Sequence, residues 1–172
     1  MTFIRTVLRS IDRMSDTAGA VGKWFALALV AVGTYETVSR HVFGAPTIWA
    51  YDTLSMAGGA LYLLGASYDY RHNAHTRVDL IYSRFSLRTR ALVDVLASLF
   101  LFFPLMTVML WYSAKWAIKA WKINEVMFNS FWYPPAGPYR TLFTVGLFLL
   151  VLQGLAQFVR DLYLVVRGTS ID

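Results

Sequence analysis

Four long apolar stretches occupy most of this 172-residue chain. They run from about 20 to 42, 48 to 68, 91 to 116 and 139 to 159, and each has the roughly 20 residues that a helix needs to cross a bilayer core. Only 15% of the residues are charged, whereas a soluble domain normally carries about a quarter. The sequence therefore predicts an all-α membrane protein, with a single domain of four transmembrane helices covering residues 1–172.

The segments around the first two helices predict how they are arranged. Gly44 and Pro46 give a short turn, so these helices should be antiparallel neighbours. Trp49 follows the turn, where aromatic rings favour the membrane interface. After the second helix, apolar residues recur every three or four positions between charged ones, which predicts a short interfacial amphipathic helix over about 77–86.

The third helix is predicted to begin after Ser86 as its N-cap. Pro104 should kink it, because the proline ring removes one backbone hydrogen bond. The helical pattern continues beyond the apolar stretch, so this helix should project from the bilayer and carry three lysines on one face: Lys115, Lys119 and Lys122.

Charge and composition bound the location and the chemistry. Eleven of the 16 lysines and arginines fall on one set of connecting segments, which places both termini in the cytoplasm by the positive-inside rule. The basic N-terminus lacks the short apolar region of a cleaved signal peptide, so we expect a retained anchor. The basic residues flank apolar runs and form no stripe, which argues against nucleic acid as a partner and leaves membrane lipid.

Residue types also disfavour catalysis and cofactors. The chain has no cysteine, so thiolate chemistry and disulfides are excluded. Haem held between helices requires histidines inside the bundle, but His41, His72 and His75 fall at predicted helix ends or in loops. No catalytic, metal-binding or phosphate-binding motif is present. We expect neither an enzyme nor a cofactor, and no catalytic, metal or substrate-binding residue.

Polar residues inside the apolar stretches are candidates for structure or function. Glu36 and Arg40 lie four apart in the order that favours an ion pair on one helix face. A structural pair is the main interpretation, and proton or cation coupling is the alternative. Gln153 and Gln157 are also four apart and need hydrogen-bond partners in hydrocarbon, either within the bundle or on another subunit.

The second helix carries a face of small residues. Such faces let helices approach closely in lipid, which predicts a docking groove for another helix of this chain or of a partner. Asp52 near the same face argues against exposure to bare lipid. The face comprises Ser55, Gly58, Gly59, Tyr62, Gly65 and Ala66.

Three motifs in order resemble the small membrane subunit, the DctQ type, of tripartite ATP-independent periplasmic (TRAP) transporters. They are RHVFGAPTIW at the first turn, HTRVDL after the second helix, and SFWYPPAGPYRTLFTVGLFLLVLQGL at the fourth. The resemblance spans roughly residues 30 to 160. One departure is Ala74, which stands before His75 where the family has glycine.

This resemblance implies a three-part importer of the bacterial inner membrane. A periplasmic binding protein captures an organic acid, a large membrane subunit carries it with sodium, and the small subunit supports the large one. Arg77 and Asp79 would then fix the interfacial helix at the cytoplasmic boundary. The binding protein would dock at the outer end, on Lys115, Lys119, Lys122, Trp132, Pro134 and Pro138.

Two other interpretations stay open at this point. A small proton-coupled multidrug exporter acting as a homodimer would use Glu36 as its carboxylate, but such a group should lie near mid-membrane and Glu36 is close to the outer end. Composition alone does not separate an assembly subunit of an unrelated membrane complex from the transporter subunit, and only the order of the motifs favours the transporter.

Overall fold

The computed structural model describes residues 2–72, 86–128 and 131–169, and these residues are almost entirely helical. No named strand occurs among them, and one isolated bridge joins Val126 to Pro135. The helices are α1 (Thr2–His41), α2 (Ala50–Arg71), α4 (Leu87–Ala97), the π-helical segment η1 (Ser98–Phe102), α5 (Phe103–Lys122) and α6 (Ala136–Arg167).

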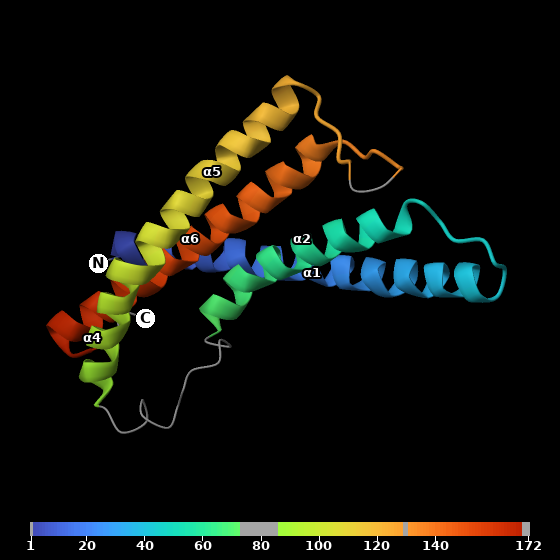
Figure 1. Ribbon diagram of the computed structural model, residues 1–172. Coiled ribbons are helices and arrows are strands. Elements are labelled where there is room, and N and C mark those ends of the chain that lie inside the picture. The colour runs from blue at the N-terminus through green and yellow to red at the C-terminus, as the bar shows by residue number, and fades with distance from the viewer. Residues whose placement is uncertain (1, 73–85, 129–130, 170–172) are drawn as a thin grey trace.

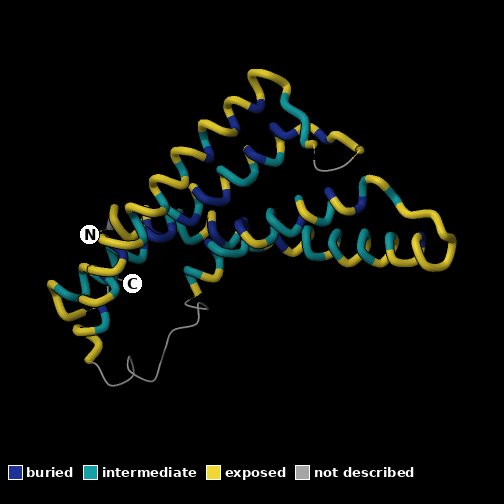
Figure 2. Tube along the Cα trace, in the orientation of Figure 1, coloured by how far each residue is buried: buried dark blue, intermediate teal, exposed yellow. Residues whose placement is uncertain are grey.

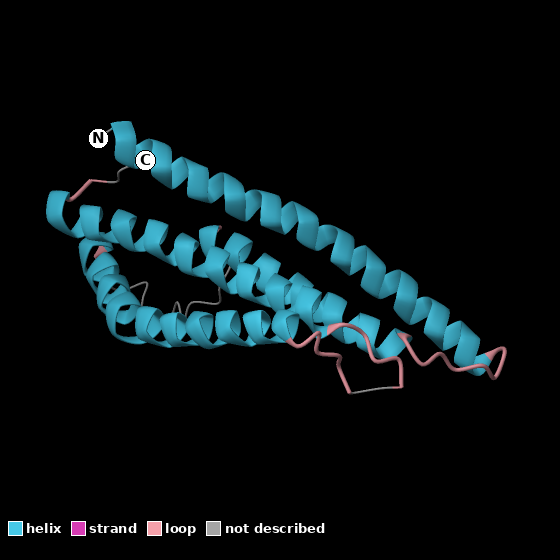
Figure 3. Ribbon diagram, turned by 90° about the horizontal axis from the view of Figure 1, so that it is seen from above, coloured by secondary structure: helices cyan, strands magenta, loops and turns pink. Residues whose placement is uncertain are grey.

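The helices form two antiparallel hairpins (Figure 1). α1 and α2 make the first, and the continuous run α4–η1–α5 makes the second with α6. Figures 1 and 3 show both termini at one end of the molecule and both hairpin loops at the other. In Figure 1 the hairpins diverge towards their loops, so they are packed together mainly nearer the termini.

α6 is the central helix, since it packs against every other described helix. Its buried residues follow one stripe at three- and four-residue spacing, visible in dark blue in Figure 2. Two glycines in the stripe permit close approach: a Cβ on Gly146 would lie 2.8 Å from Leu63 Cβ of α2, and one on Gly154 would lie 2.3 Å from Phe102 Cε1 of η1. Small residues at these crossings are what membrane helices use to pack without a hydrophobic driving force.

Among the described residues, three helical runs are long and apolar enough to cross a membrane: Phe3–His41, Leu87–Lys122 and Ala136–Arg167. They support three of the four predicted transmembrane helices. The predicted second span is a helix as well, but α2 does not reach the same apolarity, because its stretch contains aspartates, glycines, serines and tyrosines. The predicted interfacial helix lies outside the described residues, apart from Ser86.

α1 is longer than the predicted first span and includes the polar N-terminal stretch. Leu8, Ser15, Ala18 and Gly22 are buried there, and their spacing of seven, three and four places them on one helix face. The stretch is therefore an amphipathic extension of the same helix, with no proline to end it.

The third helical run begins and bends as the sequence predicts. The Ser86 hydroxyl accepts a hydrogen bond from the Thr89 backbone N–H at 3.3 Å, which confirms the N-cap. The regular α-helix gives way to the π-helical η1 just before Pro104. Figures 1 and 3 show the axis changing direction between α4 and α5, as expected where a proline and a π-bulge coincide.

Candidate functional site

One face of α2 has no neighbour within the described chain. Ser55 and Tyr62 are exposed, the latter at 77%. A Cβ added to Gly58 or Gly65 would meet no atom within 4 Å. We call Ser55, Gly58, Tyr62 and Gly65 the open face of α2. On this face the backbone of α2 is accessible. α2 is also less apolar than the three helical runs that are apolar enough to cross a membrane.

Gly59, which the sequence analysis assigned to the same small face, points inward. A Cβ on Gly59 would lie 2.7 Å from the Tyr139 hydroxyl oxygen of α6, so Gly59 packs within the bundle. Asp52 is 2% exposed and lies in the interior, away from the open face. The predicted small face is thus divided in the structure: Gly59 contacts α6, while Gly58 and Gly65 stay uncovered.

Glu36 and Arg40 form the predicted ion pair, with Arg40 Nη2 2.7 Å from Glu36 Oε1. The second carboxylate oxygen accepts from the Thr47 backbone N–H at 3.2 Å and from the Thr47 hydroxyl. Glu36 therefore ties the end of α1 to the hairpin turn. Trp49, which is half-buried, stacks on Tyr35 at 5.8 Å between ring centroids, close to the same turn. Both oxygens of the Glu36 carboxylate thus accept hydrogen bonds from Arg40 and Thr47. This structural role argues against the exporter interpretation.

A polar network that the sequence analysis missed joins α1 to α6 near the termini. Arg160 Nη2 donates to Asp12 Oδ2 at 2.6 Å, and Gln153 Nε2 donates to Asp12 Oδ1 at 3.2 Å. The Ser15 hydroxyl donates to Gln153 Oε1 at 2.8 Å, and both residues are almost fully buried. Gln153 thus finds its partners inside this chain.

The same network reaches α2. Arg71 Nη1 donates to the Asp12 backbone carbonyl at 2.9 Å and forms an ion pair with Asp16. Gln157 differs from Gln153, because it donates to Asp161 on its own helix at 3.1 Å. The acids Asp12 and Asp16 in the arginine-rich N-terminal stretch were the sequence signal for this network. Their partners lie far along the chain, beyond the reach of local spacing.

At the opposite end, Arg140 organises the loop between α5 and α6. Its two terminal nitrogens donate to the two Glu125 carboxylate oxygens at 2.5 and 2.7 Å. The guanidinium carbon also lies 3.9 Å from the ring centroid of Trp116. The hydrogen bonds from Arg140 lower the pKa of Glu125 below its ordinary value, against the opposing effect of desolvation. This fork geometry fixes the loop against α6.

The residues predicted to receive a binding protein occupy two places at this end. Lys115, Lys119 and Lys122 are exposed along α5, and Lys115 Nζ lies 4.6 Å from the Trp111 ring centroid. Trp132, Pro134 and Pro138 instead line a groove of about 420 Å³, shared with α1 and α2. The structure brings the second set together and leaves the lysines on a separate surface.

Two predicted site residues, Arg77 and Asp79, lie outside the described residues, as does His75. Within the part of the chain that was searched, no group of three or more histidines, cysteines, aspartates or glutamates could hold a metal ion. The candidate site is therefore a set of surfaces and polar contacts, with the open face of α2 as its most distinctive part.

Long apolar helices joined by a buried polar network define a multi-helix membrane protein. The family model of the DctQ component of tripartite ATP-independent periplasmic transporters matches residues 29–163. The chain belongs to this family and is a small membrane subunit of a TRAP transporter. The family is a transporter component and not a known enzyme family. No curated protein and no solved structure matches it.

Proposed function

We propose that this chain is a fixed support for the large, sodium-coupled membrane subunit of its transporter, and that it turns over no substrate itself. The observation that carries the proposal is the open face of α2, where Gly58 and Gly65 leave backbone uncovered. In lipid, a face of small residues gains most when another helix packs against it. Membership of the family implies association with other transporter components, and the partner in this proposal is the large membrane subunit.

In this proposal α2 is the fourth transmembrane helix. Its lower apolarity is then accounted for, because a helix that faces α1 and α6 on one side and a partner subunit on the other meets little lipid. The helices α1, α4–α5 and α6 expose large apolar side chains, including Trp24, Val30 and Leu101, which suit direct contact with acyl chains.

We further propose the bacterial inner membrane as the location, with both termini in the cytoplasm and both hairpin loops in the periplasm. A periplasmic binding protein carrying an organic acid would dock at the loop end. There the exposed lysines of α5 offer positive charge, and the groove at Trp132, Pro134 and Pro138 offers an apolar surface. The Glu125–Arg140 pair would hold this end in one conformation.

The docking role of α2 predicts a selective effect of Gly58→Leu. Apart from the backbone of α2 itself and the two neighbouring residues, no atom of the described chain lies within 4 Å of a Cβ at this position, so the fold should be unaffected. The leucine should nevertheless block close approach of the large subunit. We expect the fraction of large subunit that co-purifies to fall by about tenfold, which corresponds in affinity to a typical free-energy cost of overpacking. Tagged small subunit, co-expressed with the large subunit and purified in mild detergent, gives the measurement.

The matched control is Ala31→Leu, which adds a similar side chain at an exposed position of α1. It should leave co-purification unchanged. Gly59 is unsuitable for this experiment, since Tyr139 would have to move. Normal recovery of the large subunit with Gly58→Leu would exclude the open face of α2 as the docking surface.

A further inference from the structure

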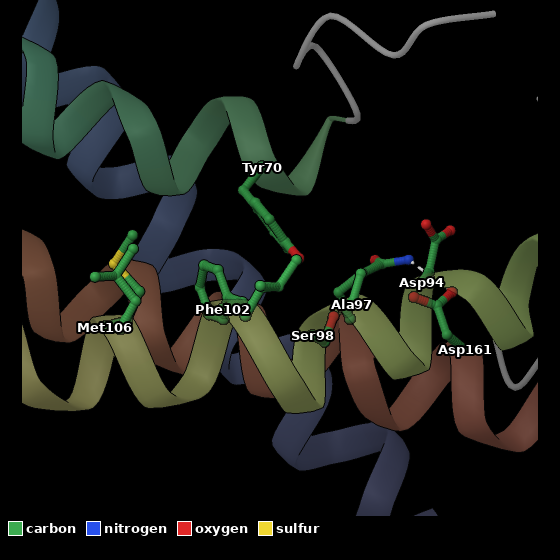
Figure 4. Close-up of a pocket in the computed structure, with 10 residues that line it drawn as sticks. Tyr70, Asp94, Ala97, Ser98, Phe102, Met106 and Asp161 are labelled. Atoms are coloured by element: carbon green, nitrogen blue, oxygen red, sulfur yellow. Dashed lines mark hydrogen bonds between the residues drawn. The ribbon is translucent and has the colours of Figure 1, made fainter.

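A cavity of about 370 Å³ lies between the end of α2, the α4–η1 segment and α6 (Figure 4). It is separate from the open face of α2 and from the groove at the loop end. Cavities of roughly 300–1,000 Å³ are the size of small-molecule sites. The proposed support function does not use it.

Two polar side chains in this cavity lack partners among the described residues. Ser98 is 7% exposed and lines the cavity, yet its hydroxyl forms no hydrogen bond with another described residue. The Asp94 carboxylate likewise forms no ion pair or hydrogen bond with any residue that the structure describes. A third polar group, the Asp161 carboxylate, accepts from Gln157. No buried polar side-chain atom of the described residues lacks a partner, so the Ser98 hydroxyl and the Asp94 carboxylate face open space in the cavity, where a ligand can reach them.

The cavity changes from polar to apolar along the helix. Asp94, Ser98, Phe102 and Met106 line it at four-residue intervals, beginning in the last turn of α4 and proceeding through η1 into the apolar α5. In Figure 4 the two aspartates lie at one end and Met106 at the other. This is the order in which a phospholipid presents its headgroup and acyl chain.

The charges select the type of headgroup. The Asp94 carboxylate repels an anionic headgroup and attracts an ammonium group, which donates charge-assisted hydrogen bonds to it. The rings of Tyr70 and Phe102, with centroids 5.5 Å apart, lie between the aspartates and Met106 in Figure 4 and add apolar surface to the middle of the cavity. We propose that this cavity binds an aminophospholipid, with its ammonium against Asp94 and an acyl chain along Phe102 and Met106.

Native mass spectrometry of the full-length chain in detergent, with added phosphatidylethanolamine or phosphatidylglycerol, tests this proposal. The unaltered chain should bind phosphatidylethanolamine about tenfold more tightly, the magnitude of one hydrogen bond to a charged group. Asp94→Asn should remove that preference. The matched control Asp69→Asn, at an exposed position near the same end of α2, should retain it.

Equal binding of the two lipids by the unaltered chain would overturn the proposal, as would Asp94→Asn that folds normally and keeps the preference. Circular dichroism and elution volume report the fold of each variant. If Asp94→Asn does not fold, Ser98→Ala provides the result instead, because it removes the unpartnered hydroxyl at nearly unchanged side-chain volume. Weaker binding of phosphatidylethanolamine by Ser98→Ala supports the site, and unchanged binding refutes it.

Discussion

Gly146→Leu should strongly destabilise the fold. A Cβ at this position would lie 2.8 Å from Leu63 Cβ and 3.4 Å from the Leu63 backbone carbon, and neither atom can rotate away. A leucine therefore forces α2 and α6 apart at their crossing. We expect a loss of about 3 kcal/mol in the free energy of unfolding, the upper part of the range for overpacked cores, measured by titration with sodium dodecyl sulfate.

Gly58→Leu is the control for this prediction, because it introduces the same side chain on α2 where no atom lies within 4 Å. Its unfolding curve should coincide with that of the unaltered chain. If Gly146→Leu unfolds at the same detergent fraction as Gly58→Leu, the close crossing of α2 and α6 is wrong.

The second large effect is expected at Asp12. Its carboxylate accepts hydrogen bonds from Arg160 and Gln153, and Asp12 and Arg160 side chains are only 13% and 15% exposed. Asp12→Ala removes the carboxylate that accepts hydrogen bonds from the Arg160 guanidinium in a largely buried place. Breaking such a pair from one side costs about 3 kcal/mol, so the variant should unfold at a clearly lower fraction of sodium dodecyl sulfate.

A double-mutant cycle separates this pair from general damage to the N-terminal helix. Arg160→Met alone should also destabilise the protein, and the two substitutions together should cost much less than their sum. Arg9→Gln, at an exposed position of α1, should have no effect. Additive losses at Asp12 and Arg160 would mean that the two side chains do not interact.

The sequence was sufficient for those parts of the fold that depend on local pattern. Apolar length predicted the helices, Ser86 the start of α4, and Pro104 the interruption of the third helical run. The N-terminal stretch was harder, because Asp12 and Asp16 lower its apolarity. Only their buried partners show why a polar segment continues α1.

The candidate surfaces were predictable only in part. Gly58 and Gly59 differ by one position, hence by about 100° around the helix, and composition assigns both to one small face. Only the location of α6 shows that Gly59 is covered and Gly58 is open. Similarly, Arg71 and Arg160 are among the eleven basic residues that predicted the cytoplasmic side of the chain, whereas in the structure both also form ion pairs with the N-terminal acids.

Uptake into proteoliposomes tests the central claim most directly. The chain, the large subunit and the binding protein would be combined singly and together, under an inward sodium gradient, with the carboxylic acid that the binding protein retains. We predict no accumulation with this chain alone, accumulation with all three components, and loss of uptake when this chain is omitted. Accumulation of the acid by this chain alone, without the large subunit, would contradict the claim that it supports transport without performing it.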